Sequence, residues 1–391
     1  MGRIEQETSG SRSGKTRLIV ACLSAALIAT ACIPRDTSQI VLDEERTFSG
    51  FGASWDLEYY VNNAYECGLS GNYSFMVMNP AGDPNAEAPL WVFLHGGAVG
   101  YWDDQGDYYA AKNQDEDSHN HQEDFDRLIW HLEVRTLDGD GQPEDQTLVR
   151  RIQEGYRVLV VGYCDHDLYL GIGSKYPNHP TNPNAKVNGL QATMAAIDYT
   201  AANYPTTQVW AHGTSAGSAG VWGLASSYGS EGTPLTGGIA DSTILSPNYS
   251  TVVETLGPLG QTRLDPGFEP EGVTEKVGWF SDPAIPSFAE AQIADRDFRA
   301  VPVMWIGGDA DPFCSGNRSP ITEAAALGIS NCGYTFLGIS DAVANQANTP
   351  HEFHLLPATG HVPTNDPGPA NDLVDDFIDN VLATNPPNFG P

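Results

Sequence analysis

The sequence is poor in basic residues. Its 391 residues include 19 lysines and arginines against 50 aspartates and glutamates, which gives a formal net charge of −31. A surface of this sign repels the phosphate backbone of a nucleic acid, so we do not expect nucleic-acid binding. The acidity would keep the surface hydrated in salty surroundings, but it identifies no partner.

A long apolar run is missing near the N-terminus. The run at 18–31 contains two hydroxyl residues and is shorter than the about 20 apolar residues that a membrane-spanning helix needs. Because it follows a polar stretch with basic residues, it is typical of a secretory signal peptide, which we place at residues 1–31.

The signal peptide ends in Ala29-Thr30-Ala31-Cys32. This pattern resembles the site at which bacterial lipoproteins are cleaved and acylated. We therefore expect export to the bacterial cell envelope or beyond, with a lipid anchor on Cys32 as the chain's contact with the membrane. The alternative is ordinary cleavage nearby, which would leave Cys32 unmodified. A polar tether would follow at 32–45.

Cysteine is scarce, with six residues in the whole chain. Four of them would remain in the exported body after Cys32, namely Cys67, Cys164, Cys314 and Cys332. An even number of cysteines in an oxidising compartment favours two disulfides. Four cysteines allow three pairings. We prefer Cys314 with Cys332 because they are close in sequence, which leaves Cys67 with Cys164, but the sequence does not decide the pairing.

The chain also lacks internal repeats and any linker rich in proline, glycine or serine. Its content of 40% hydrophobic and 10% aromatic residues is that of a globular protein. We therefore expect one domain over 46–391. The segment 103–154 is unusually polar and is predicted to be an insertion, with a lid over the site as its hypothetical role.

Short apolar runs that end in turn residues recur along this domain, as buried parallel strands do. Between them, as over 190–201 and 373–382, apolar residues recur at helical spacing. This alternation predicts an α/β fold with a central, mostly parallel sheet flanked by helices. The expected strands are Leu90–Leu94, Arg157–Val161, Gln208–Ala211, Val301–Ile306 and Phe353–Leu356.

The strongest motif is Gly213-Thr214-Ser215-Ala216-Gly217, which follows an expected strand and opens a helix of small residues at 218–227. A GxSxG sequence in this context forms the sharp turn on which α/β-hydrolases present a nucleophilic serine. A bland glycine-rich turn is the alternative, but the strand and helix around it favour Ser215 as a nucleophile.

A serine nucleophile needs a histidine base and an acid that orients it, which follow the serine in chain order in this fold. Asp309 and Asp311 both follow a strand, and we favour Asp311 for its GxxD spacing. His361 follows the last strand and is the expected base. His351 and His354 lie in or beside that strand, so we expect them to be structural.

The oxyanion of the tetrahedral intermediate needs N–H donors. His95-Gly96-Gly97-Ala98 follows an early strand, and its bare glycines suit such a loop. The N–H of Ala216, next after the nucleophile, completes the expected hole. We expect His95 itself to be structural.

Regularly spaced metal ligands are absent. The acids and histidines at 115–124 read as a solvated loop, and Asp138-Gly139-Asp140-Gly141 lacks the glutamate that closes a calcium loop at its twelfth position. We expect neither a metal nor another cofactor.

The run Tyr163-Cys164-Asp165-His166-Asp167, with Asn188-Gly189 and the GxSAG turn after it, resembles the pectin acetylesterase and Notum-like family. The resemblance covers roughly 89–361. It implies carboxylic ester hydrolysis by Ser215, Asp311 and His361, with Gly97, Ala98 and Ala216 as oxyanion donors.

These observations predict a secreted serine esterase that forms an acyl-enzyme, with small acyl esters as substrates, such as O-acetyl groups on a polysaccharide. Three alternatives stay open. A lipase or peptidase would use the same triad, a catalytically silent binding module would share the fold, and a structural surface lipoprotein would explain the anchor and the acidity.

Overall fold

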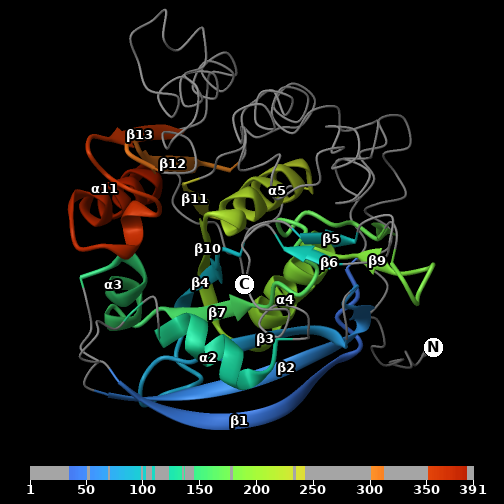
Figure 1. Cartoon of the computed structure of the whole chain (residues 1–391). Helices are drawn as coiled ribbons and strands as arrows, with labels where there is room; N and C mark the ends of the chain where they lie inside the picture. Colours follow the sequence, from blue (N-terminus) through green and yellow to red (C-terminus); the bar gives the residue numbers. More distant parts are fainter. Residues whose placement is uncertain are drawn as a thin grey trace, which may run out of the picture. The chain divides into compact units, whose positions relative to one another are not determined.

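The computed structural model describes residues 35–50, 53–68, 71–97, 100–102, 108–110, 123–133, 136, 145–176, 179–231, 235–242, 301–311 and 351–384. The expected signal peptide, Cys32, Ala98, Cys314 and Cys332 lie outside these residues. The main feature of the described part is a nine-stranded sheet with the strand order β1-β2-β3-β7-β4-β10-β11-β12-β13 (Figure 1).

The sheet is antiparallel at one side and parallel over the rest. From β1 to β7 neighbouring strands run antiparallel, and from β7 to β13 they run parallel. The antiparallel side consists of β1 (Ile40–Gly50), β2 (Ala53–Glu66) and β3 (Asn72–Met78). The parallel strands are β7 (Arg157–Val161), β4 (Ala88–Leu94), β10 (Thr206–Thr214), β11 (Gly237–Asp241), β12 (Val303–Gly308) and β13 (Glu352–Leu356).

Helices cover both faces of this sheet. The larger ones are α2 (Phe125–Glu133), α3 (Thr147–Gln153), α4 (Gly189–Asn203), α5 (Ala216–Glu231) and α11 (Pro369–Thr384), and a short 3-10 helix, η4, spans Pro363–Asn365. Two small ribbons pair β5 (Gly100–Trp102) with β6 (Tyr108–Ala110), and β8 (Ser174–Lys175) with β9 (Lys186–Val187).

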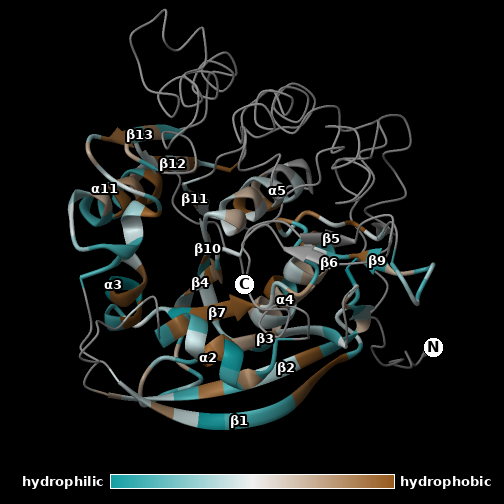
Figure 2. Ribbon diagram, viewed as in Figure 1, coloured by the Kyte–Doolittle hydropathy of each residue, from teal (hydrophilic) through white to brown (hydrophobic). Residues whose placement is uncertain are grey.

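The two faces follow from the alternation of side chains along each strand. In β4, Trp91 and Phe93 belong to a core cluster with buried residues of α2, α3 and α11. Leu94 points the other way, where Gly217 and Gly220 of α5 come close to it. Figure 2 shows β7 hydrophobic over most of its length, as expected for a strand buried on both faces.

The α/β-hydrolase fold expected from the sequence is confirmed by this mostly parallel sheet with helices on both faces. Each of the five expected strands is present. Among the described residues, no helix combines the length and the apolar character needed to cross a membrane.

Two boundaries expected from the sequence are wrong. The tether was placed at 32–45, but β1 begins at Ile40 and pairs with β2, because its backbone completes the edge of the sheet. The segment 103–154 is not one polar insertion. Its second half forms α2 and α3, whose residues Leu128, Leu132 and Ile152 are fully buried in the core. Most of 103–122, where a lid would lie, is outside the described residues.

Candidate active site

Ser215 lies on the turn between β10 and α5. Its φ is 54°, in the left-handed region that a non-glycine residue adopts only when its surroundings enforce it. The N–H of Ser215 donates a hydrogen bond of 2.9 Å to the carbonyl oxygen of Asp241, at the end of the neighbouring strand β11. The turn expected from the GxSxG sequence is therefore present, with the serine in the strained position.

The glycines of this motif allow close packing of the backbone. A Cβ on Gly213 would lie 2.0 Å from the carbonyl oxygen of Gly217, and a Cβ on Gly217 would lie 2.0 Å from that of Leu94. Neither contact could be relieved without moving backbone. The motif thus fixes the serine against both β4 and the first turn of α5.

Asp311 and His361 are adjacent although 50 residues separate them. Nδ1 of His361 lies 2.7 Å from Oδ2 of Asp311. The Asp311 side chain is 3% exposed and that of His361 is 17% exposed, so the carboxylate is buried and the imidazole borders solvent. A carboxylate oxygen accepts a hydrogen bond from a proton on Nδ1, which leaves Nε2 as the ring nitrogen that can take up a further proton.

Asp309, the competing acid, has a different position. Its Oδ1 accepts a hydrogen bond of 2.6 Å from the backbone N–H of Ala358, and its own N–H donates to Leu356. Asp309 therefore fixes the loop that carries the histidine, while Asp311 faces the histidine itself.

Two residues missed by the sequence analysis connect the serine turn with the histidine loop. Asp241, whose carbonyl accepts the N–H of Ser215, also accepts a hydrogen bond of 3.0 Å from the N–H of Thr364 at Oδ2. Ser242 accepts the N–H of Val362 at 2.7 Å and donates to Asp241 at 2.9 Å. The pair Asp241-Ser242 thus holds Val362 and Thr364, the first and third residues after His361.

Asp241 is also electrostatically unusual. It is fully buried, and burial raises its pKa to about 6, although hydrogen bonds from Thr364 and Ser242 partly oppose this shift. The only signal of this pair in the sequence is an acid after the short small-residue run at 237–240. That run is too weakly patterned to identify a strand.

The loop after β4 lies against the serine turn. A Cβ on Gly96 would lie 2.9 Å from Cβ of Ser215, and a Cβ on Gly97 would lie 2.7 Å from the ring of Tyr163. Both positions therefore require glycine. Ala216 is the first residue of α5, so its N–H has no partner within the helix and is available at the same turn.

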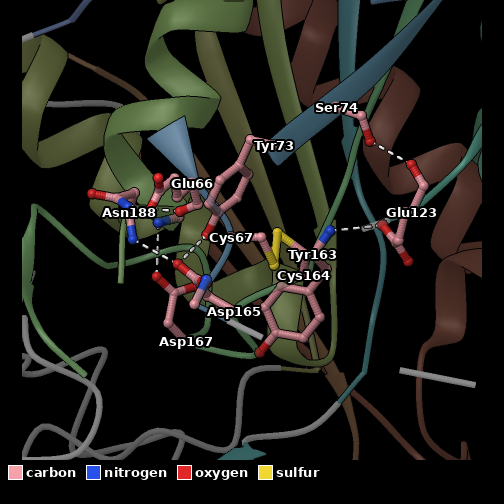
Figure 3. The surroundings of a disulfide bond; sticks show 12 residues. Glu66, Cys67, Tyr73, Ser74, Glu123, Tyr163, Cys164, Asp165, Asp167 and Asn188 are labelled. Carbon is pink, nitrogen blue, oxygen red and sulfur yellow. Dashed lines mark hydrogen bonds between the residues drawn. A yellow bond between two sulfur atoms is a disulfide. The ribbon is translucent and has the colours of Figure 1, made fainter. Parts of the chain in front are cut away.

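The Tyr163–Gly171 loop supports this glycine loop from behind. A disulfide joins Cys164 to Cys67, one of the pairings that the sequence allowed, with the two Cα atoms 5.8 Å apart (Figure 3). Three non-glycine residues of the loop have positive φ, an uncommon concentration of strain. They are His166, Leu168 and Tyr169.

Two buried carboxylates hold the strained loop in place. Asp165 accepts hydrogen bonds from the Tyr73 hydroxyl at 2.6 Å and from the Asn188 N–H at 2.7 Å (Figure 3). Asp167 accepts the N–H groups of Gly171 and Gly189, each at 2.8 Å. Burial raises the pKa of both carboxyls, and the charge of Asp167 adds to the shift for Asp165.

Glu123, grouped by the sequence with a solvated acidic loop, is instead 7% exposed. Its carboxylate lies between His95 and His131, and ligand atoms of these three residues lie within 4.8 Å of one another. The interpretation as a solvated residue is wrong. The helix α2, which begins two residues later, packs against β3 and β7, and the carbonyl oxygen of Glu123 accepts hydrogen bonds from the Tyr59 and Ser74 hydroxyls in the interior.

Taken together, the described residues place a strained serine, a histidine paired with a buried acid, and a glycine loop at the carboxyl ends of parallel strands of the sheet. Such a set has the components of nucleophilic acyl transfer: a hydroxyl, a base with an orienting acid, and backbone donors.

No protein-family model matches the chain. No curated protein matches it either. Similar solved structures include Est1E from Butyrivibrio proteoclasticus (14% identity, 87% of this chain and 100% of that chain, TM-score 0.41). A second is acetyl xylan esterase 1 from Thermoanaerobacterium sp. JW/SL YS485 (13% identity, 88% of this chain and 88% of that chain, TM-score 0.46). A third is an S-formylglutathione hydrolase from Agrobacterium tumefaciens (11% identity, 87% of this chain and 96% of that chain, TM-score 0.44). These likenesses are too distant to assign an activity, which has to be argued from the site.

Proposed function

We propose that the chain is a serine carboxylic-ester hydrolase that uses Ser215, His361 and Asp311. The observation that carries the proposal is the 2.7 Å contact between Nδ1 of His361 and the buried carboxylate of Asp311. The loop of this histidine is tied through Asp241 to the turn of Ser215. A purely structural aspartate–histidine pair would not need a connection through Asp241 to the turn of a serine held at positive φ.

The reaction has two steps in this proposal. His361 takes the hydroxyl proton of Ser215 as the oxygen attacks the ester carbonyl, and then gives that proton to the departing alcohol. Water, deprotonated by His361, attacks the acyl-enzyme, and the proton returns to Ser215 as the acid leaves. Asp311 holds the ring and stabilises the imidazolium in both steps.

The oxyanion formed in each step would be stabilised by N–H groups of Gly97, Ala98 and Ala216. Gly97 packs on Tyr163, and Ala216 begins α5. The backbone at these two of the three donor positions is therefore held in place by its neighbours. Removing one such donor typically lowers kcat by about 10² to 10³.

We further propose short acyl esters, such as O-acetyl groups on a polysaccharide, as substrates. This step rests on the resemblance to the pectin acetylesterase and Notum-like family, and the disulfide-bound loop at Cys164 is the part of the described structure that carries the resembling residues. A lipase, a peptidase or a silent binding module remain the competing functions.

Export with a lipid anchor on Cys32 is also proposed. The Cys67–Cys164 disulfide supports an oxidising compartment. Labelling of cells with a fatty-acid analogue tests the anchor. The natural protein should incorporate it and a Cys32→Ala variant should not, and a labelled variant would refute acylation at this residue.

Hydrolysis of p-nitrophenyl esters from acetate to palmitate tests the activity and its chain-length preference. Ser215→Ala should lose turnover, whereas Ser227→Ala, which changes a buried serine within α5, should keep it. Release of acetate from an acetylated polysaccharide then separates an acetylesterase from a lipase. A folded natural protein that hydrolyses none of these esters would favour the binding module.

A further inference from the structure

The glycine loop of the candidate site begins with His95, directly after β4, and continues through Gly96 and Gly97. On the side of the nucleophile, a Cβ on Gly96 would lie 2.9 Å from Cβ of Ser215. On the interior side, His95 is 1% exposed. Backbone donors stabilise an oxyanion only if they are in place before the reaction. The groups that hold the loop from the interior therefore determine whether its N–H groups can serve as such donors.

Glu123 contacts the start of this loop through the ring of His95. Oε2 of Glu123 lies 3.2 Å from Nε2 of His95, and Nδ1 of the same ring lies 2.9 Å from the carbonyl oxygen of Gly96. The imidazole thus spans from a buried carboxyl group to the backbone of the residue that borders Ser215. The hydroxyl of Tyr169 donates to the carbonyl oxygen of His95 at 3.3 Å, so this residue is held through both its side chain and its backbone.

Glu123 also contacts the residue on which the second glycine packs. Its Oε2 accepts the backbone N–H of Tyr163 at 2.6 Å, a contact drawn in Figure 3. The ring of Tyr163 lies against Gly97, since a Cβ on this glycine would be 2.7 Å from the ring. One oxygen of Glu123 therefore reaches both His95, at the start of the loop, and Tyr163, against the second glycine.

Glu123 is itself fixed from several directions. Its Oε1 lies 3.1 Å from Nε2 of His131 on α2. Its carbonyl oxygen accepts hydrogen bonds from the hydroxyl of Tyr59 on β2, at 2.9 Å, and from the hydroxyl of Ser74 on β3. Because both its backbone and its side chain are held by the antiparallel strands and α2, the carboxyl group has a defined position relative to the loop.

We propose that Glu123 is a positioning residue for the oxyanion-forming loop and that it acts through the reach of its side chain. Its carboxyl group sets the distance between His95 and Tyr163. The backbone of Gly96 and Gly97 lies between these two contacts and takes its position from them. The role in catalysis rests on the proposed function. The proposal concerns the length of the side chain and not the charge of the ring beside it.

The side chains of His95, Glu123 and His131 could also offer ligands to a metal ion, since one atom of each lies within 4.8 Å of the others. The two histidine rings are stacked, however, with centroids 3.4 Å apart and planes 13° from parallel. A zinc ion binds about 2.0 to 2.1 Å from a histidine nitrogen, along a lone pair that lies in the plane of the ring. Two stacked, nearly parallel rings offer no common point of that kind, so the geometry favours direct contacts.

Two substitutions separate reach from charge. Glu123→Gln keeps the length of the side chain and an oxygen that can accept the Tyr163 N–H, but it removes the carboxylate. Glu123→Asp keeps the carboxylate but is shorter by one methylene group, so it cannot reach His95 and Tyr163 from the same backbone position. For p-nitrophenyl acetate, kcat should stay within about fivefold of the natural value in Glu123→Gln and fall by about 10² in Glu123→Asp, with KM changed by less than about twofold.

Glu58→Asp is the matched control. The carboxylate of Glu58 also joins several donors, because it accepts hydrogen bonds from Asn79, at 2.8 Å, and from the hydroxyls of Tyr60 and Tyr204. This cluster lies away from the site, since Tyr204 stands two residues before the amino end of β10 and Ser215 follows the carboxyl end of that strand. Shortening Glu58 should therefore leave kcat unchanged.

Two readouts separate a positioning role from a merely structural one. An alkylboronic acid forms a tetrahedral adduct on the serine that resembles the intermediate, so its affinity should fall in Glu123→Asp by about the same factor as kcat/KM. Crystal structures should show the backbone nitrogen of Gly97 displaced in Glu123→Asp and in its natural place in Glu123→Gln. The crystal structures require no ester hydrolysis, so a failure of the proposed function is distinguishable from a failure of this proposal.

A folded Glu123→Asp protein with the natural kcat and an unmoved Gly97 would overturn the proposal. A fall in kcat as large in Glu123→Gln as in Glu123→Asp would overturn it too, because the effect would then follow the charge. One tightly bound metal ion per chain, lost in His131→Ala, would overturn it in favour of a metal site. If Glu123→Asp does not fold, Tyr163→Leu removes the ring against Gly97 and should lower kcat by at least about tenfold; an unchanged kcat would again overturn the proposal.

Discussion

Replacement of Ser242 by alanine tests whether the histidine loop depends on the end of β11. The hydroxyl oxygen of Ser242 accepts the N–H of Val362 and donates to Asp241. Val362, directly after His361, has φ of 60° and is 5% exposed. Its N–H would have no acceptor in the Ser242→Ala variant, and a left-handed valine would lose the contact that holds it.

The expected loss follows from these contacts. A buried donor without an acceptor costs about 1 to 3 kcal/mol. The left-handed conformation stores about 1 to 3 kcal/mol more, which the loop can release only by moving. We therefore expect about 2 kcal/mol less stability. We also expect at least about a tenfold fall in kcat, because a base displaced by even about 1 Å loses its alignment with Ser215.

Urea unfolding and steady-state hydrolysis of p-nitrophenyl acetate measure the two effects. Thr359→Ala is the control, since Thr359 lies on the same loop but its exposed hydroxyl donates to the carbonyl oxygen of Pro357, two residues earlier. It should change stability by less than about 0.5 kcal/mol. If Ser242→Ala keeps the natural kcat and stability, Ser242 does not hold the loop.

Three further predictions follow from the site. Asp311→Asn should lower kcat by about 10⁴ through the wrong histidine tautomer, whereas Asp309→Asn should mainly loosen the loop; equal effects on kcat would contradict the assignment. Burial raises the pKa of Asp241 to about 6, so its contribution to stability, complete below about pH 4, should fall by about 3 kcal/mol as pH rises through 6. Asp241→Asn should abolish this difference in unfolding measured against pH, and an unchanged slope would refute it. The Cys67–Cys164 disulfide joins residues 97 apart in sequence, and its removal should lower the free energy of unfolding by about 4.7 kcal/mol through chain entropy. Urea unfolding of Cys164→Ser measures this loss, and a loss below about 1 kcal/mol would contradict the prediction.

The parallel half of the fold was predictable because its strands are short apolar runs buried on both faces. Arg157–Val161 and Phe353–Leu356 were located from that pattern, and β7 and β13 match them to within a residue. The antiparallel strands were not predictable from the sequence, because exposed and buried residues do not alternate regularly along β1 and β2. Side-chain polarity in β1 indicated a tether, whereas backbone pairing with β2 made it a strand.

The site shows the same division. Ser215, Asp311 and His361 occupy turns that sequence motifs and strand ends identify, because those turns need particular small residues. Glu123 and Ser242 could not be found in this way. Their roles depend on contacts over 28 and 120 residues, with His95 and Val362, and nothing in the local sequence indicates those partners.

Mass-spectrometric mapping of a fluorophosphonate adduct tests the central claim most directly. The reagent reacts with a serine only where a base activates the hydroxyl and donors accept the developing charge. The account predicts one adduct per chain on the peptide that contains Ser215, with none in the folded Ser215→Ala variant and a much slower reaction in Asp311→Asn. A folded natural protein that forms no adduct, or forms it on another serine, would contradict the account.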